Sequence, residues 1–365
     1  MIKRSSLTLA VILSIAPLAA ALAQSPPAPK PVSAADRHAV LQALAATLQA
    51  NYVFPDVAKT VSASLLAKEA SGGYAAVGNT EAFAEALSTD LRTLGEDGHF
   101  QVGYDPDFRA PPPANTAPSK AELEQRRQEI ADHGFGIQKV ELLPGNVGYL
   151  EVRGFGPGEF VSEAFDAALN LLSGSEALVL DLRRNGGGEP ESVAYLMSHF
   201  SAAGDARHLN DIYTRPGDST RQYWTSAAVQ GRYGKPVYVL TSARTFSGGE
   251  ECAYDFQTQK RAILVGETTG GGANPGDGFA LAKGFAAFIP TGRAINPVTH
   301  TNWEHVGVKP DIAVPAADAL KTAHAAILRG FLATSKVPEE RQYLQEVLAK
   351  VESGVADVPN YKPPH

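Results

Sequence analysis

The segment 177–182 constrains the fold most, because its sequence ALVLDL is an almost continuous apolar run. A strand that is apolar on both faces is typical of a parallel sheet covered by helices on both sides. Other strand-like segments occur at 137–142, 147–152, 237–240, 262–265 and 285–290, and helical periodicity lies between them at 159–172, 191–200 and 250–259. This alternation predicts an α/β protein.

The remaining chain lies before and after this α/β region. Helical periodicity followed by one strand-like segment predicts a small N-terminal helical domain over residues 34–104. The Pro-rich segment 105–133 ends in a charged helix and is either a surface linker or a lid over a cleft. We place the core at 134–315, and C-terminal helices with a tail at 316–365.

The start of the chain indicates export. A short basic region at Met1–Arg4 precedes an apolar stretch, and Ala21-Leu-Ala23 is a small-residue cleavage site, so residues 1–23 are expected to form a signal peptide. The apolar stretch is short for a membrane span, although an uncleaved anchor is the alternative. The Pro- and Ala-rich residues 24–33 are expected to be a disordered leader. We therefore expect a periplasmic or extracellular protein.

Composition narrows the class further. Cys252 is the only cysteine, so no intramolecular disulfide can form. The net charge of −7 is spread along the chain, no basic run favours nucleic acid, and no second apolar segment favours a membrane. The oligomeric state is not indicated.

The segment after Tyr238 is a candidate nucleophile turn. An apolar run ends there, Ser247 follows beside Gly248 and Gly249, and a helix-like segment comes next. A serine nucleophile needs this layout, because backbone N–H groups that no side chain covers must stabilise its oxyanion. Ordinary turns show the same pattern, so the motif alone does not establish catalysis.

A second glycine-rich loop follows the buried strand, in the sequence Asp181-Leu-Arg-Arg-Asn-Gly-Gly-Gly188. Its N–H groups could converge on an anion, and the sequence lacks the GK[ST] and G-x-G-x-x-G signatures of nucleotide sites. We expect either an oxyanion hole shared with the N–H after Ser247 or a plain tight turn. No cofactor is expected.

His99 is the candidate base among nine histidines, because it follows a glycine turn and opens a short strand. A structural role is the alternative. His300 and His305 flank Glu304 in a spacing that matches no metal motif, and there is no cysteine cluster, so no metal site is expected.

Three ordered blocks resemble the tail-specific, or C-terminal-processing, serine peptidase family. They are the Asp181–Gly188 loop, Thr245-Phe-Ser-Gly-Gly-Glu250 with Arg261–Thr268, and Gly307-Val-Lys-Pro-Asp-Ile312. Other phrases resemble the branch that contains interphotoreceptor retinoid-binding protein, namely Asn51-Tyr-Val-Phe-Pro55, Asp97-Gly-His99 and Ile295-Asn-Pro-Val-Thr-His-Thr-Asn-Trp-Glu304. Together these blocks run from about residue 50 to 315.

The resemblance implies a crotonase/ClpP-like core of repeated β-β-α units, with Ser247 as the nucleophile. It implies oxyanion donors at Gly248 and in the loop that holds Gly187 and Gly188. The chain departs from the better-known members in two respects. The position of their lysine base falls in Gly270-Gly-Gly-Ala273, and the segment 105–133 is too short for their PDZ domain.

The missing lysine makes His99 more prominent. Resemblance to the tricorn-like relatives implies a triad of Ser247, His99 and Glu304, in which Glu304 accepts the second ring N–H of the imidazole. Such a triad is chemically coherent, since a neutral imidazole can take the serine proton at neutral pH. Asp97 is the rival residue for orienting His99.

Two more charged residues are candidates for substrate binding. Arg183 lies beside the loop glycines and could hold a substrate carboxylate, or it could anchor the loop through a salt bridge. Glu267 could line the site or form a structural ion pair.

We therefore expect an exported serine hydrolase that cleaves peptide or protein substrates through a Ser247 acyl-enzyme. Its site is expected between the helical domain and the core. The alternative is a non-catalytic carrier of retinoid-like or fatty-acid-like ligands. A purely structural or interaction role has only the Pro-rich connector in its favour.

Overall fold

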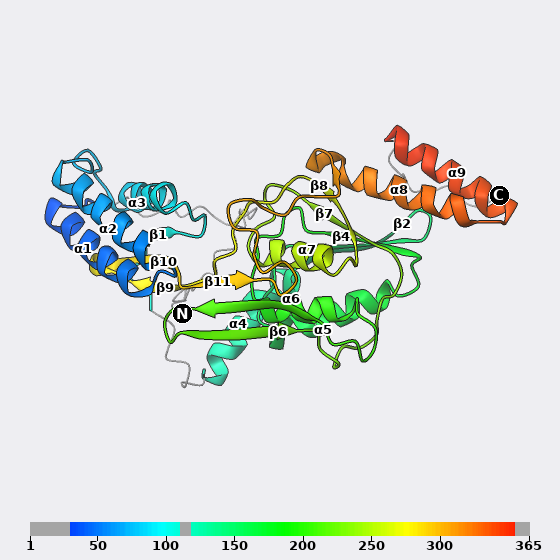
Figure 1. Cartoon of the computed structure of the whole chain (residues 1–365), viewed down its shortest axis with the longest axis horizontal. Helices are drawn as coiled ribbons and strands as arrows, with labels where there is room; N and C mark the ends of the chain where they lie inside the picture. The colour runs from blue at the N-terminus through cyan, green and yellow to red at the C-terminus, as the bar shows by residue number, and fades with distance from the viewer. Residues whose placement is uncertain (1–29, 110–117, 355–365) are drawn as a thin grey trace, which may run out of the picture. The chain divides into compact units, whose positions relative to one another are not determined.

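The computed structural model describes residues 30–109 and 118–354 (Figure 1). The expected signal peptide, most of the expected leader, part of the Pro-rich segment and the end of the tail lie outside these residues. The described chain forms two compact units. Unit 1 comprises residues up to 126, 208–223 and 271–307, and unit 2 comprises 127–207, 224–270 and 308 onward.

Three helices begin unit 1, namely α1 (Ala34–Asn51), α2 (Pro55–Ala70) and α3 (Thr80–Gly95). Ser33 and Asn79 cap α1 and α3, because the side chain of each accepts a backbone N–H from the first turn of its helix. Pro31 forms a β-bridge with Asn79 and Val32 is buried, so the last residues of the expected leader pack onto this unit.

A three-stranded antiparallel sheet packs with these helices. Its strands β1 (Gln101–Tyr104), β10 (Phe285–Pro290) and β9 (Gly276–Ala280) lie in the order β1-β10-β9, with Val102 opposite Ala287. Buried residues of β1 and β10 share one hydrophobic core with α1–α3, and Figure 1 shows these elements together. Part of the region expected to form a continuous 134–315 core thus packs in unit 1 with the N-terminal helices, and the domain boundaries stay a prediction.

A second small sheet lies largely in unit 1. It contains β11 (Gly292–Ile295), β5 (His208–Thr214) and β6 (Ser219–Trp224), with β11 antiparallel to β5. The sequence patterns did not indicate these three strands.

Unit 2 is built on a six-stranded sheet in the order β12-β8-β7-β4-β3-β2. Its strands are β2 (Ile137–Leu143), β3 (Val147–Val152), β4 (Ala177–Asp181), β7 (Val237–Thr241), β8 (Ile263–Gly266) and β12 (Ile312–Ala313). Only the β2–β3 pair is antiparallel. Every residue of β3 and β4 is buried, as the apolar run at 177–182 predicts.

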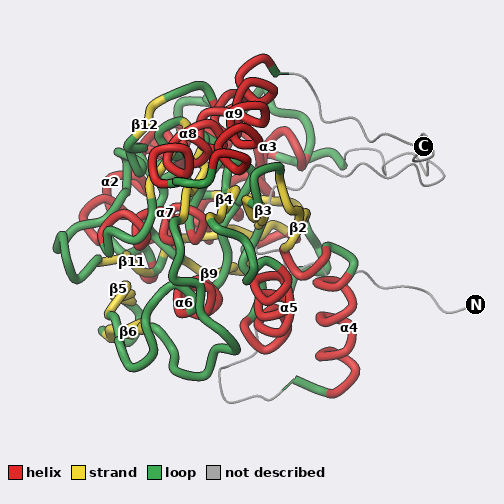
Figure 2. The backbone as a smooth tube through the Cα atoms, turned by 90° about the vertical axis from the view of Figure 1, so that its right-hand side faces the viewer, coloured by secondary structure: helices red, strands yellow, loops and turns green. Residues whose placement is uncertain are grey.

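Helices connect and cover the parallel strands. They are α5 (Gly158–Leu171), α6 (Pro190–Ser198) and α7 (Gly248–Thr258), followed after the sheet by α8 (Ala319–Thr334) and α9 (Pro338–Ser353). Figure 2 shows α5 and α6 on one side of β2–β4 and α8 on the other. Ala319, Ala323 and Ile327 of α8 share a buried core with alternate residues of β3 and β4. The expected α/β class with a helical N-terminal region is thus confirmed, and the crotonase-like unit remains a prediction.

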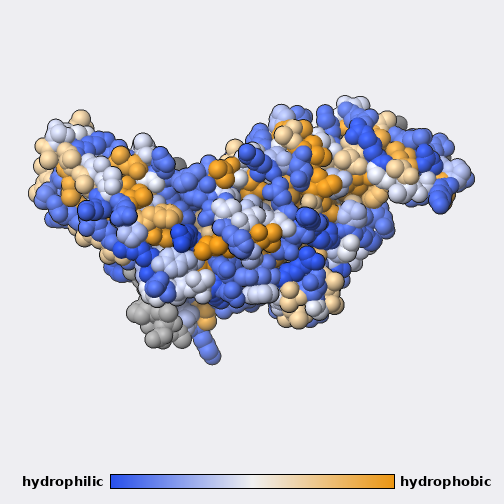
Figure 3. Space-filling view, in the orientation of Figure 1, coloured by the Kyte–Doolittle hydropathy of each residue, from blue (hydrophilic) through white to orange (hydrophobic). Residues whose placement is uncertain are grey.

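The charged helix expected near residue 120 is present as α4 (Lys120–Ala131) and has no buried residue. No helix of the described ranges is long and apolar enough to cross a membrane. In Figure 3, hydrophobic residues are interspersed with hydrophilic ones on the face shown, including over α8 and α9.

Candidate active site

Ser247 stands at the turn between β7 and α7 with a backbone conformation that is rare for a residue with a side chain. Its φ is 53° and its ψ is −123°, and the side chain is partly exposed. Such geometry is costly and persists where the surroundings enforce it. Here the Ser247 N–H donates to Glu250 Oε2 at 2.9 Å, and Glu250 is fully buried. The sharp strand–turn–helix geometry is the one by which hydrolases expose a nucleophilic hydroxyl.

The second glycine loop packs directly against this turn. A Cβ added at Gly187 would lie 2.7 Å from Ser247 Cβ and 2.9 Å from Gly248 N. A Cβ at Gly248 would lie 3.0 Å from Gly188 N. Glycine is therefore required on both sides, since any larger residue would separate the two loops.

The amides of this loop differ in their availability. Gly187 N–H donates to Asn185 Oδ1 at 2.8 Å, so the expectation that Gly187 is an oxyanion donor is corrected. Within the described part of the chain, the N–H groups of Gly188 and Gly248 donate to no other residue. These two amides lie close together beside Ser247 and can meet an anion there.

Buried hydrogen bonds fix the loop relative to the serine turn. Asn185 is fully buried and donates through Nδ2 to Val152 O at 3.0 Å. The backbone carbonyl of Asn185 accepts the Phe246 N–H at 3.0 Å. Thr245 Oγ1 donates to the carbonyl of Leu182 at 2.8 Å. Sequence reasoning did not single out Asn185, although a polar residue directly before three glycines is a recognisable signal of loop anchoring.

Arg183 is engaged inside the fold. Its Nη2 pairs with Asp181 Oδ2 at 2.5 Å and its Nη1 donates to Ala316 O at 2.7 Å. The hydrogen bonds and charge of Asp181 raise the pKa of Arg183, while burial opposes this effect. These contacts favour the loop-anchoring alternative over carboxylate capture.

Glu267 also has internal partners. Its two carboxylate oxygens accept the backbone N–H groups of Ala316 at 3.0 Å and Ala243 at 3.3 Å. These hydrogen bonds lower the pKa of Glu267. Through them, Glu267 links the loop at Ala243 to the loop at Ala316.

His99 lies in unit 1, just before β1, and only 9% of its side chain is exposed. The carboxylate of Asp97 accepts the His99 backbone N–H at 3.0 Å through Oδ1, and the same oxygen is 3.5 Å from His99 Nδ1. The expected placement of His99 at a turn before a short strand is confirmed.

Glu304 lies in unit 1 as well, with 8% of its side chain exposed. Its Oε2 accepts the Ala273 N–H, and its own N–H donates to Asn302 Oδ1 at 2.9 Å. Glu304 therefore fixes the backbone at Ala273, the last residue of the segment 270–273 in which the resemblance places the lysine base of other members.

The candidate residues thus form two groups, each held within one unit. Ser247, Gly188 and Gly248 belong to unit 2, while His99 and Glu304 belong to unit 1. The described residues contain no group of three or more metal-ligating side chains.

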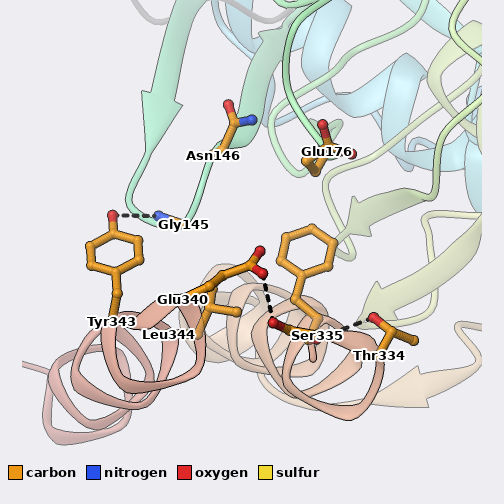
Figure 4. Close-up of a pocket in the computed structure, with 9 residues that line it drawn as sticks. Gly145, Asn146, Glu176, Thr334, Ser335, Glu340, Tyr343 and Leu344 are labelled. Atoms are coloured by element: carbon orange, nitrogen blue, oxygen red, sulfur yellow. Dashed lines mark hydrogen bonds between the residues drawn. The ribbon is translucent and has the colours of Figure 1, made fainter. Parts of the chain in front are cut away.

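A pocket of about 560 Å³ occupies a different part of unit 2 (Figure 4). It lies between the β2–β3 turn and the helices α8 and α9, where Tyr343 OH accepts the Gly145 N–H at 3.3 Å. Glu176, Phe331 and Glu340 also line it. An apolar ligand there would desolvate two carboxylates, so this pocket does not support the carrier alternative.

Two family models match the chain. The model of peptidase family S41 matches residues 146–314, and the model of the N-terminal domain of peptidase S41 in eukaryotic IRBP matches residues 34–144.

Curated relatives match part of the chain. Carboxyl-terminal-processing peptidase 2, chloroplastic, of Arabidopsis thaliana is 30% identical over 187 residues, which are 47% of this chain and 34% of the relative. The carboxy-terminal processing protease CtpB of Bacillus subtilis is 29% identical over 196 residues, which are 53% of this chain and 39% of the relative. The chain thus matches less than half the length of these relatives.

Two solved structures share the fold. A candidate peptidase from Parabacteroides merdae has a TM-score of 0.54 at 20% identity, covering 84% of this chain and 99% of its own. A lipoprotein from Streptococcus agalactiae has a TM-score of 0.52 at 13% identity, covering 81% and 97%. The two family models are adjacent and span residues 34–314 almost without a gap, and the chain belongs to peptidase family S41.

Proposed function

We propose that this protein is a serine-type peptidase, a hydrolase that cleaves peptide or protein substrates through an acyl-enzyme on Ser247. The observation that carries the proposal is the placement of Ser247, at a positive φ, against two amides that donate to no other described residue. Membership in family S41 and the similarity to carboxyl-terminal-processing peptidases support the same activity.

The oxyanion would be held by two of the three predicted donors. Gly188 and Gly248 present their N–H groups beside Ser247, whereas Gly187 serves as the close-packed link between the two loops. Preorganised donors of this kind are worth about 10²–10³-fold in rate each, because they meet the charge that develops in the transition state.

The base would be the imidazole of His99. It would take the Ser247 proton during attack and return it to the leaving amine, and then activate water for deacylation. A carboxylate beside the ring would stabilise the imidazolium. Glu304, implied by the family resemblance, has 8% of its side chain exposed, and Asp97, the rival, is buried; both belong to unit 1.

Export would place this activity outside the cytoplasm. The basic start, apolar stretch and Ala21-Leu-Ala23 support cleavage after Ala23. Mass analysis of the protein recovered from the secreted or periplasmic fraction should give an N-terminus at Gln24, and a full-length chain beginning at Met1 would contradict this.

Hydrolysis itself is tested with fluorescein-labelled casein and a synthetic peptide library. Wild type should release peptides, while Ser247→Ala should not. Ser173→Ala is a matched control, because this exposed serine donates to Asn170 O and lies in no predicted site. Equal cleavage by wild type and Ser247→Ala would overturn the proposal.

A further inference from the structure

In unit 1, a cluster of buried polar residues surrounds Asp97, which lies two positions before His99. The helix α3 ends at Gly95, Glu96 takes a left-handed φ of 52°, and Asp97 follows. Asp97 Oδ1 accepts the His99 backbone N–H at 3.0 Å, so a two-residue turn holds the carboxylate against the backbone that carries the imidazole. The same oxygen lies 3.5 Å from Nδ1 of the ring.

The other carboxylate oxygen of Asp97 is held by two residues from distant segments. Asn274 Nδ2 donates to Asp97 Oδ2 at 2.9 Å, and Tyr52 OH donates to it at 3.3 Å. All three residues are 1% exposed. A buried carboxylate is costly without such donors, so the meeting of these three buried residues from distant parts of the chain indicates a site that the fold builds.

Tyr52 and Asn274, the two donors to Asp97 Oδ2, are supported by their own surroundings. Burial, and then the charge and hydrogen bond of Asp97 with a contribution from Glu304, raise the pKa of Tyr52 far above its usual range, so its hydroxyl remains a donor at any working pH. The Ala273 N–H donates to Glu304, which immobilises the backbone next to Asn274. Glu304 thus supports the same carboxylate through the chain that carries Asn274.

We propose that Asp97 is the carboxylate that orients the His99 imidazole through Nδ1, and that Tyr52 and Asn274 are positioning residues that hold this carboxylate. The catalytic consequence rests on the proposed peptidase function. With Nδ1–H directed at Asp97, the Nε2 lone pair is left to accept the serine proton, and the carboxylate stabilises the imidazolium that forms.

The ring tautomer provides a test that does not require hydrolysis. In full-length protein labelled with ¹⁵N-histidine, the His99 signal is assigned by its loss in His99→Gln. At a pH where the ring is neutral, wild type should carry its proton on Nδ1, and Asp97→Asn should shift the population toward the Nε2–H tautomer. An unchanged tautomer in Asp97→Asn would overturn the proposal, whether or not the protein is a peptidase.

Kinetics on fluorescein-labelled casein provides the second test, with a matched control from the same unit. Tyr74 OH donates to Asp90 Oδ2 at 2.5 Å and is also buried, so Tyr74→Phe removes an equivalent Tyr–Asp bond elsewhere. Tyr52→Phe should lower kcat about tenfold with KM unchanged, since a hydrogen bond to a charged group is lost. Tyr74→Phe should stay within about twofold of wild type despite a similar fall in the unfolding midpoint.

Stronger effects are expected closer to the ring. Asp97→Asn should lower kcat by about 10³–10⁴-fold, as expected when an imidazole loses the group that fixes its tautomer. Asn274→Ala should lower kcat at least as much as Tyr52→Phe, because its hydrogen bond is shorter. Losses in Tyr52→Phe and Asn274→Ala that merely match Tyr74→Phe would show a structural role only and overturn the assignment. If casein is not cleaved by wild type, the tautomer populations of the same variants decide.

Discussion

Replacing Gly187 with alanine tests the contact between the glycine loop and the nucleophile turn. Gly187 has φ 106°, and an added Cβ would meet Ser247 Cβ at 2.7 Å, whereas ordinary contact begins at 3.4 Å. The difference, 3.4 Å less 2.7 Å, requires the two loops to separate by about 0.7 Å. Misplacement on the order of 1 Å costs about 10²-fold in rate, so we expect kcat on casein to fall about 100-fold.

Alanine at position 187 is also strained by the positive φ itself, apart from the clash, so the control variant must carry the same backbone strain. An alanine in such a conformation is strained by roughly 1–3 kcal/mol. Gly204 has φ 79°, is exposed and would bring no atom within 4 Å of an added Cβ, so Gly204→Ala carries the strain without the clash. We expect both variants to lose several degrees in unfolding midpoint and only Gly187→Ala to lose activity. Activity of Gly187→Ala within twofold of wild type, or an equal loss in Gly204→Ala, would refute the reasoning.

Three further outcomes follow from the core of unit 2. Asn185→Ala should lower the free energy of unfolding by about 3 kcal/mol in a denaturant titration, because it leaves a buried N–H and a buried carbonyl without partners; no loss would show that the loop is not anchored by this side chain. Burial, and then the charge of Glu251, raise the pKa of Asp255 well above its usual range. Above the pKa of the unfolded state, the native protein therefore keeps a proton that the unfolded chain releases. The stability of the native state is accordingly higher at low pH and falls as the pH rises. The unfolding midpoint of Asp255→Asn relative to wild type should therefore increase by roughly 2 °C per pH unit above pH 5 until the native group ionises, and a pH-independent difference would contradict the assignment. Arg183→Met should destabilise the fold without changing the preference for peptides with a free carboxyl terminus, which competition between amidated and free peptides measures.

Much of the core could be predicted because its signals are local. The strands Val147–Val152 and Phe285–Pro290 have the predicted bounds, because apolar and aromatic residues dominate both short segments. By contrast, β5 and β6 are largely polar, and β9 (Gly276–Ala280) contains two glycines in five residues, so no pattern identified them. Local sequence also does not encode the pairing of β1 with β10, which assigns a late segment to the N-terminal unit.

The candidate site divides in the same way. The turn at Ser247 could be predicted, because a nucleophile turn needs small residues at adjacent positions. The donor role of Gly187 was predicted wrongly, because the Asn185 side chain takes that amide, and the hydrogen bond depends on how the loop closes. Asp97 was recognised only as a rival, and Asn274, which holds it from 177 residues away, carried no local signal.

Labelling with a fluorophosphonate tests the central claim most directly, because the reagent modifies an activated serine without requiring knowledge of the substrate. Intact mass and peptide mapping of the folded protein should show one adduct on Ser247, and Ser247→Ala should show none. Folded wild type that remains unlabelled, or that is labelled at another residue, would contradict the assignment of Ser247 as the nucleophile of a serine peptidase.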